Sequence, residues 1–131
     1  MIDVSNEIFT VLADAVREAH PDVTVIGENL RVPTKLPCVT IDETNNVPSR
    51  RDTSETEPFA EVTYRVQVFC TGAGKRAQAR TIFATVDEAC YKLNLIRKTY
   101  TTTPDVYNSS IYQINATFEA EVRRDGMIFR R

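Results

Sequence analysis

Residues 59–74 have the sequence FAEVTYRVQVFCTGAG, and the architecture of the chain can be worked out from this stretch and the segment that follows it to residue 95. Between Glu61 and Thr71 polar and apolar side chains alternate, apart from Phe69, which predicts a strand with one buried face. A glycine turn at residues 72–74 ends this strand. Apolar residues then recur at steps of three and four, which predicts a helix with one apolar stripe: Ala79, Ile82, Phe83, Val86, Ala89, Cys90 and Leu93. The strand face and the helix stripe can bury each other as a minimal two-layer core.

A first amphipathic helix is predicted near the start of the chain. Ser5 or Asp3 can cap it, and it ends before Pro21. Its apolar stripe consists of Ile8, Phe9, Leu12, Ala15, Val16 and Ala19. After it, residues 23–26 and 30–32 are predicted to be extended, and Pro37 opens a strand over residues 38–42.

Further strands are predicted after the second helix. Residues 98–103 are rich in β-prone side chains, and residues 110–124 show the longest alternation in the chain. Asp125-Gly126 is a two-residue hairpin signal, so residues 127–129 are expected to form a short last strand. We therefore expect a single α+β domain over residues 1–131. It consists of an antiparallel or mixed β-sheet with two amphipathic helices packed on one face and the polar strand faces exposed.

A long polar segment, residues 43–58, separates two of the predicted strands. Val47 is its single apolar residue, so burial against its own domain cannot offset the entropy of ordering it. If the flanking strands pair, the segment becomes a long projecting hairpin arm, and connections of this length are often functional. We expect contacts with neighbouring molecules from its charged residues: Arg50, Arg51, Asp52, Glu55 and Glu57.

The composition excludes several classes of protein. The chain has 131 residues, a net charge of −2 and a pI near 5.4, which gives no general attraction for nucleic acid or anionic lipid. No window approaches the ~20 apolar residues of a membrane span. The first residues lack the basic and apolar regions of a signal peptide, so we expect the protein to be cytoplasmic where it is made. The three cysteines, Cys38, Cys70 and Cys90, lie in apolar patterns that predict buried reduced thiols.

Residues suited to catalysis are sparse. The segment GAGK at residues 72–75 follows a strand and opens a helix, as a phosphate-binding loop does. However, Phe69 stands where that motif needs a glycine, and Arg76 where it needs Ser or Thr. His20 is the only histidine and lies at a helix end, which favours interaction with the helix dipole over catalysis. The acidic pair at residues 42–43 is typical of a solvated strand end. We expect no catalytic residue, no metal site, no cofactor and no enzymatic activity.

The order of features along the chain carries a family resemblance. An opening amphipathic helix precedes the Pro-led strand LPCVTI (residues 36–41), the polar segment, and the strand EVTYRVQV (61–68). A glycine turn then leads into a helix, and the strand ending in FEAEV (118–122) precedes a hairpin. This order, over nearly the whole chain, resembles the tail terminator, or tail completion, proteins of long-tailed bacteriophages and prophages.

The resemblance implies a structural protein of the virion, located at the tail and neck and assembled in the cytoplasm of a bacterial host. Its subunits are expected to form a homo-oligomeric ring, a hexamer in that family, that caps the head-proximal end of the tail tube. The ring stops tube polymerisation and joins the tail to the neck and head. Expected partners are the tail tube protein and a neck protein, and genome DNA passes through the lumen without specific binding. No membrane is involved.

Two alternatives remain open from the sequence. The chain fits another structural subunit of a phage neck or tail tube, because such proteins share its length and β-rich composition. It also fits a non-enzymatic protein-binding adaptor domain that uses the polar segment to grip a partner. All three hypotheses describe an assembly or binding module.

Overall fold

The computed structural model describes residues 3–27, 37–50, 59–104, 111–123 and 128–129. Within them the chain forms helices and strands in the order that the sequence predicts: α1 (Ser5–Ala19), β1 (Thr24–Ile26), β2 (Cys38–Arg50), β3 (Phe59–Thr71), α2 (Lys75–Lys92), β4 (Ile96–Pro104), β5 (Ile111–Arg123) and β6 (Ile128–Phe129). The extended segment predicted at residues 30–32 and the turn predicted at 125–126 lie outside the described residues.

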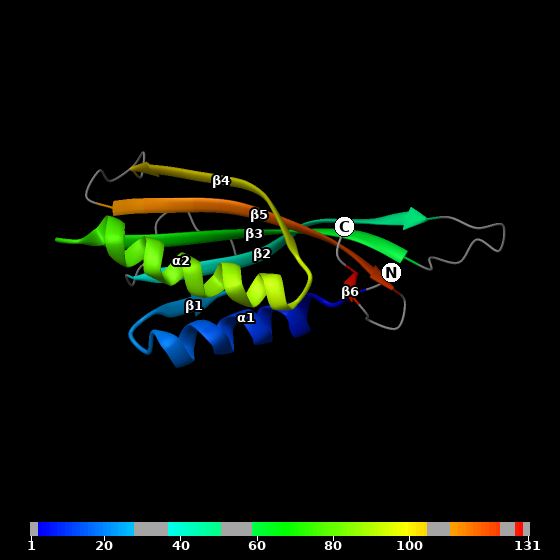
Figure 1. Cartoon of the computed structure of the whole chain (residues 1–131), viewed down its shortest axis with the longest axis horizontal. Helices are drawn as coiled ribbons and strands as arrows, with labels where there is room; N and C mark the ends of the chain where they lie inside the picture. Colours follow the sequence, from blue (N-terminus) through cyan, green and yellow to red (C-terminus); the bar gives the residue numbers. More distant parts are fainter. Residues whose placement is uncertain (1–2, 28–36, 51–58, 105–110, 124–127, 130–131) are drawn as a thin grey trace.

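The strands form one mixed sheet. Its order is β1-β2-β3-β5-β4, and β6 pairs with the far end of β5. Only β1 and β2 run parallel among the described strands, and the other pairings are antiparallel. The helices α1 and α2 lie side by side on one face of the sheet (Figure 1). The predicted α+β architecture, a sheet with two helices on one face, is therefore confirmed.

The main core lies between the two helices and the sheet. Ile8, Leu12 and Val16 of α1 are fully buried, and so is Val86 of α2. They belong to one cluster with inward-facing side chains of the strands, including Val39, Val62, Val66, Val68, Ile114 and Phe118. Removing such a side chain from water contributes about 1.5–3 kcal/mol. Because α2, β3 and β5 contribute a large share of this cluster, the unit predicted from residues 59–95 is central to the fold.

Phe69, the exception in the alternation of β3, lies on the other face of the sheet. There it forms a second, smaller buried cluster with Cys38 and Ile111, and the partly buried Ile26 packs against it. Phe69 is the register partner of Cys38, so the two side chains share a face. The expectation that the polar strand faces are exposed therefore does not hold at the end of the sheet where β1 lies.

The strand predicted over residues 38–42 is longer than expected, and the predicted arm over residues 43–58 is not confirmed. Residues 43–50 continue β2 and pair with β3 until Arg50 lies opposite Phe59, with irregularities between Glu43 and Asn45 and between Pro48 and Arg50. Figure 1 shows β2 and β3 running side by side past the start of α1. Backbone hydrogen bonds to β3 order this segment, so its lack of apolar residues did not decide its structure. Residues 51–58 lie outside the described residues, and a projecting arm is not confirmed.

The turn between β3 and α2 depends on its glycines. Gly72 and Gly74 have φ angles of 86° and 75°, in the left-handed region that side chains with a Cβ rarely adopt. The Gly74 carbonyl accepts the Gln78 N–H at 2.9 Å, which starts the helical hydrogen-bond ladder. These two glycines therefore let β3 reverse into a helix that lies back over its own strand.

Candidate interaction surfaces

The residues considered for catalysis are not brought together. His20 Nε2 lies 2.9 Å from Thr85 Oγ1, so the imidazole joins the end of α1 to the middle of α2. Asp42 and Glu43 point to opposite faces of the sheet, as neighbours in a strand do. Asp42 pairs with Arg65 at 3.0 Å, and Glu43 accepts a hydrogen bond from Tyr64 at 2.6 Å. The two carboxylates therefore act separately as structural partners.

The three cysteines are buried thiols in the reduced state. Burial raises the pKa of Cys38 and of Cys70 to about 11, and burial together with the nearby Asp87 carboxylate raises the pKa of Cys90 further. A thiol with a raised pKa carries little thiolate at neutral pH and is a poor nucleophile. Within the described ranges, no three His, Cys, Asp or Glu side chains are grouped as a metal site requires.

The residues predicted to contact neighbours lie at the end of β2 and beyond it. Arg50 is the last residue of β2, and its side chain is not among those described. Arg51, Asp52, Glu55 and Glu57 lie outside the described residues. The described surfaces available for interaction therefore lie on the sheet and on the helices.

The face of the sheet opposite to α1 and α2, here called the helix-free face, carries a ladder of polar side chains. Thr40 Oγ1 donates to Gln67 Oε1 at 2.9 Å, and Gln67 Nε2 donates to Asn115 Oδ1 at 3.0 Å. Gln113 Nε2 also donates to Asn115 Oδ1, at 2.8 Å. Thr40 and Gln67 are buried, with exposed fractions of 0% and 8%. The ladder joins β2, β3 and β5 through satisfied hydrogen bonds, which is how buried polar groups are tolerated.

Cations on the helix-free face are matched by carboxylates. Arg65 pairs with Asp42, and Lys98 Nζ lies 4.0 Å from Glu119 Oε2. The hydroxyls of Thr99 and Thr117 are 2.8 Å apart. A surface that grips nucleic acid needs cations directed at phosphates, preferably with aromatic platforms. The described part of this face is polar and carries more carboxylates than cations, because Glu61 and Glu121 also lie on it.

The sheet has two unlike edges. On β2, pairing with β1 stops at Thr40, and no described strand pairs with residues 41–45 on that side. On the opposite edge, no described strand pairs with the outer side of β4. An irregularity between Arg97 and Thr99 interrupts β4, which leaves residues 99–103, TYTTT, as its regular outer segment. Unpaired edges of β-prone sequence are sites at which another strand can add.

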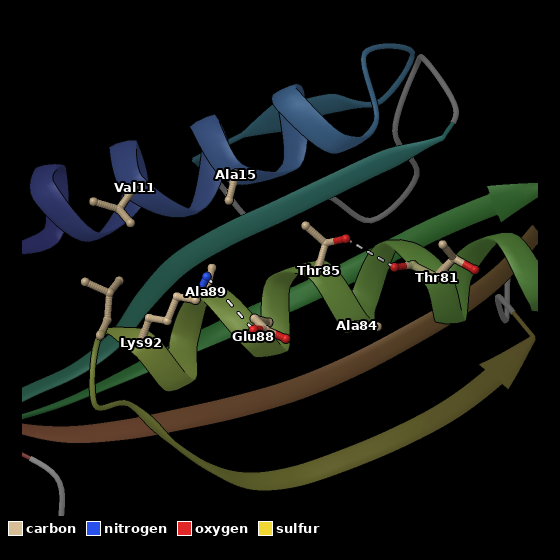
Figure 2. A pocket seen from close by; sticks show the side chains of 9 residues that line it. Val11, Ala15, Thr81, Ala84, Thr85, Glu88, Ala89 and Lys92 are labelled. Atoms are coloured by element: carbon tan, nitrogen blue, oxygen red, sulfur yellow. Dashed lines mark hydrogen bonds and ion pairs between the residues drawn. The ribbon is translucent and has the colours of Figure 1, made fainter.

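A groove separates the outer sides of α1 and α2 (Figure 2). It has a volume of about 560 Å³. Val11 and Ala15 line it from α1, and Ala84 and Ala89 are among the residues that line it from α2. The predicted stripe of α1 left Val11 out, and the structure leaves 39% of this side chain exposed. Ala84 is likewise an apolar, exposed residue outside the predicted stripe of its helix, so apolar residues outside the stripes are the sequence signal for the groove.

The threonine hydroxyls that line the groove are bound within the protein, whereas the charged side chains are largely exposed. The Thr81 hydroxyl donates to the Ala77 carbonyl at 3.0 Å, and the Thr85 hydroxyl donates to the Thr81 carbonyl at 3.4 Å and lies beside His20. Lys92 Nζ lies 3.9 Å from Glu88 Oε1. The groove therefore combines apolar contact with the exposed charges of Glu88 and Lys92.

Comparisons with known proteins identify no family. No protein-family model matches the chain, and no curated protein matches it. Neither helix, over the part of the chain that the structure describes, is long and apolar enough to cross a membrane.

Proposed function

We propose that this chain is a non-enzymatic structural subunit of a ring that caps the head-proximal end of a bacteriophage tail tube. The ring stops tube polymerisation and joins the tail to the neck. The proposal combines the family resemblance of the sequence with the α+β fold, whose order of elements agrees with the resemblance. One structural observation carries it: the sheet ends in two unlike edges, β2 on one side and β4 on the other.

Unlike edges suit a ring because a ring is closed by heterologous contacts, in which one surface of each subunit meets a different surface of the next. Residues 99–103 of β4 in one subunit can meet residues 41–45 of β2 in its neighbour. The threonine and tyrosine residues of the β4 segment favour strand conformation. The irregularities in β2 and β4 and the charged residues at the ends of both segments limit the length over which the two edges can pair. A contact of limited length joins subunits and still prevents open-ended aggregation.

In the proposed ring, a lumen lined by the helix-free face would hold more carboxylates than described cations, which agrees with the expected passage of DNA. Each neutralised phosphate adds salt-dependent affinity, so a row of unmatched cations would retain the genome. Arg65 and Lys98 are each matched by a carboxylate. A lumen with this chemistry is a conduit, and the isolated protein is expected to bind DNA weakly and with strong salt dependence.

The proposal is tested by removing the gene from a phage or prophage that carries it and imaging the particles by negative stain. Tails of abnormal length that lack heads are expected, and the wild-type gene supplied in trans should restore normal particles. The purified wild-type protein should form a ring, with six subunits by native mass spectrometry. Normal-length tails joined to heads in the absence of the gene would refute the terminator role. Tubes or necks missing altogether would indicate a tube or neck subunit.

A further inference from the structure

The side of α2 that faces β4 carries arginine and tyrosine side chains. The Arg76 guanidinium lies over the Tyr112 ring of β5, 5.8 Å from its centroid. Arg80 is exposed and follows Arg76 by four residues, which places it on the same side of the helix. Tyr91, which is 63% exposed, follows Arg80 by eleven residues, or about three turns. These four side chains and Tyr100 of β4, which is 38% exposed, are here called the arginine-tyrosine strip.

Contacts with β4 show which side of α2 this is. The ring centroids of Phe83 and Tyr100 lie 5.0 Å apart, and Asp87 Oδ1 lies 3.2 Å from Arg97 Nη1. Phe83 and Asp87 follow Arg80 by three and seven residues, so Arg80 shares their side of the helix. Arg80 is not among the residues that line the groove toward α1. The strip and the groove are therefore separate surfaces.

The two arginines of the strip have no carboxylate partner among the described residues. The carboxylates of α2 are Asp87 and Glu88, and both are engaged elsewhere. Asp87 pairs with Arg97, and Glu88 pairs with Lys92 on the groove side. Lys75 adds a further cation at the start of the helix. Because like charges four residues apart on a helix repel each other, this arrangement favours a partner that brings carboxylates.

The strip suits the carboxylates of a protein better than a nucleic acid strand. Binding of a single strand needs cations along the phosphates and aromatic faces that are free to stack on bases. Here Arg76 covers the Tyr112 ring, and the Tyr100 ring contacts Phe83 and Arg97. A guanidinium has a planar fork of donors that matches a carboxylate in two parallel hydrogen bonds.

We infer that the strip binds an extended acidic segment of another protein, with two carboxylates two residues apart and apolar residues beyond them. Arg76 and Arg80 are separated by a helix rise of about 6 Å. Alternate residues of an extended segment are separated by about 6.6 Å and point to the same side, so two carboxylates can meet both guanidiniums.

The exposed rings of Tyr91 and Tyr100 offer apolar contact further along the strip. Arginine and tyrosine are the residue types enriched where protein interfaces bind most strongly. Two strips meeting face to face would bring the arginines of two copies together, which opposes a contact between identical surfaces. The inference does not rest on the proposed ring.

The probe is a fluorescein-labelled peptide of about ten residues, with glutamate at two alternate positions and leucine at two later ones. One matched peptide has glutamine in place of glutamate, and a second has serine in place of leucine. Anisotropy titrations use the full-length protein. The glutamate-leucine peptide is expected to bind at least tenfold more tightly than the glutamine peptide and at least threefold more tightly than the serine peptide.

Equal binding of the glutamate-leucine peptide and either matched peptide, or no binding by the glutamate-leucine peptide, would overturn the inference. A labelled oligothymidylate of similar length tests the other class of partner. Tighter binding of the oligothymidylate than of the glutamate-leucine peptide would assign the strip to nucleic acid, and would also overturn it.

Two double variants with the same change of net charge locate the binding. Arg76→Gln with Arg80→Gln removes the unmatched cations, whereas Arg17→Gln with Lys92→Gln removes two exposed cations that pair with carboxylates of their own helices. The first variant is expected to weaken binding of the glutamate-leucine peptide at least tenfold and the second less than twofold, with unchanged circular dichroism in both. The loss should shrink in high salt. Equal losses would overturn the inference, because general charge attraction would then account for the binding.

Sedimentation of the protein without peptide tests a second copy of the chain as the occupant. Self-association that the Arg76 and Arg80 variant abolishes and the Arg17 and Lys92 variant retains would assign the strip to a contact between copies, and would overturn the inference. The same sedimentation profile in wild type and both variants, whether ring or monomer, together with the peptide results above, supports the assignment to a different protein.

Discussion

The hydroxyl of Tyr64 donates a hydrogen bond of 2.6 Å to Glu43 Oε2, and the two residues are register partners on β3 and β2. Tyr64 is 2% exposed. Burial raises the pKa of Tyr64 well above its ordinary value, and the carboxylates of Glu43 and Asp3 raise it further. The phenol therefore stays neutral and acts as a donor. This bond holds β2 to β3 at Glu43, the first residue of the segment predicted to form an arm, immediately before the irregularity at Thr44.

Tyr64→Phe tests the contribution of that bond. Hydrogen bonds to charged groups contribute about 1.5–3 kcal/mol, and Glu43 is only partly buried, so it can regain water. We expect Y64F to lower the free energy of unfolding in urea by about 1.5 kcal/mol. Tyr100→Phe, at a tyrosine that is 38% exposed, should change it by less than about 0.5 kcal/mol. Equal effects of the two substitutions would contradict the role given to Glu43.

Alkaline pH should destabilise the protein through its buried thiols. Burial raises the pKa of Cys70 from 9.0 in the unfolded chain to about 11 in the folded protein. A raised folded pKa gives stability that is complete below the unfolded pKa and is lost as pH rises toward the folded value. Between pH 9 and 11, stability should fall by about 1.4 kcal/mol per pH unit for each such thiol.

Cysteine-to-alanine variants measure this loss. Cys70→Ala should be less stable than wild type at pH 7, because a buried side chain is shortened, but its stability should fall less steeply between pH 9 and 11. The measurement is a set of urea titrations under reducing conditions across that range. Parallel pH dependences for wild type and C70A would show that Cys70 is accessible to water in the folded state.

The polar ladder on the helix-free face should be sensitive to the loss of one member. Gln67→Leu leaves the Thr40 hydroxyl, which is 0% exposed, without its acceptor, so we expect a cost of about 1–3 kcal/mol. Thr40→Val made together with Gln67→Leu removes both partners and should recover part of that cost. A double-mutant cycle by urea denaturation gives the coupling. Additive effects would mean that the hydrogen bond contributes little.

Periodicity predicted the elements that bury one face. The alternation over residues 61–71 and the stripe from Ala79 to Leu93 are local patterns, and the structure confirms both. The hairpin signal predicts a short last strand at residues 127–129, and the structure has it as β6 over residues 128–129, paired with β5. Such patterns can be recognised within a single segment, because a helix or strand with one buried face repeats its apolar side chains at a fixed spacing along the sequence.

Long-range pairing could not be predicted from composition. Residues 43–50 are polar, and only the partner strand supplies the hydrogen bonds that extend β2. Phe69 stood out as an exception, but its partners Cys38 and Ile111 come from other strands and are fixed by register. The groove between α1 and α2 depends on how two helices pack, and in the sequence only apolar residues outside the predicted stripes, Val11 and Ala84, point to it.

A charge in the helix-sheet core should unfold the domain. Val86 is 0% exposed in the stripe of α2 that faces the sheet, so Val86→Asp buries a carboxylate without a partner. We expect V86D to lack the cooperative thermal transition seen in wild type. Ala77→Asp is the matched control, because Ala77 is exposed in the first turn of α2, where a negative charge favours the helix. A cooperative V86D domain would contradict the assignment of the core.

The last prediction concerns the two unlike edges of the sheet. If β4 of one subunit meets β2 of the next, cysteines placed on the two edges will come together between subunits and not within one. Thr101 and Asn45 are suitable because both are exposed, and the three native thiols are buried. The double variant Asn45→Cys with Thr101→Cys, treated with a short bis-maleimide, should give a ladder on denaturing gels that ends at the closed ring of six.

Either single variant should remain monomeric on such gels, because a heterologous contact never places two copies of one edge together. Dimers from a single variant would indicate a two-fold contact, and the double variant remaining monomeric at concentrations where the protein is oligomeric would remove the sheet edges from the ring interface.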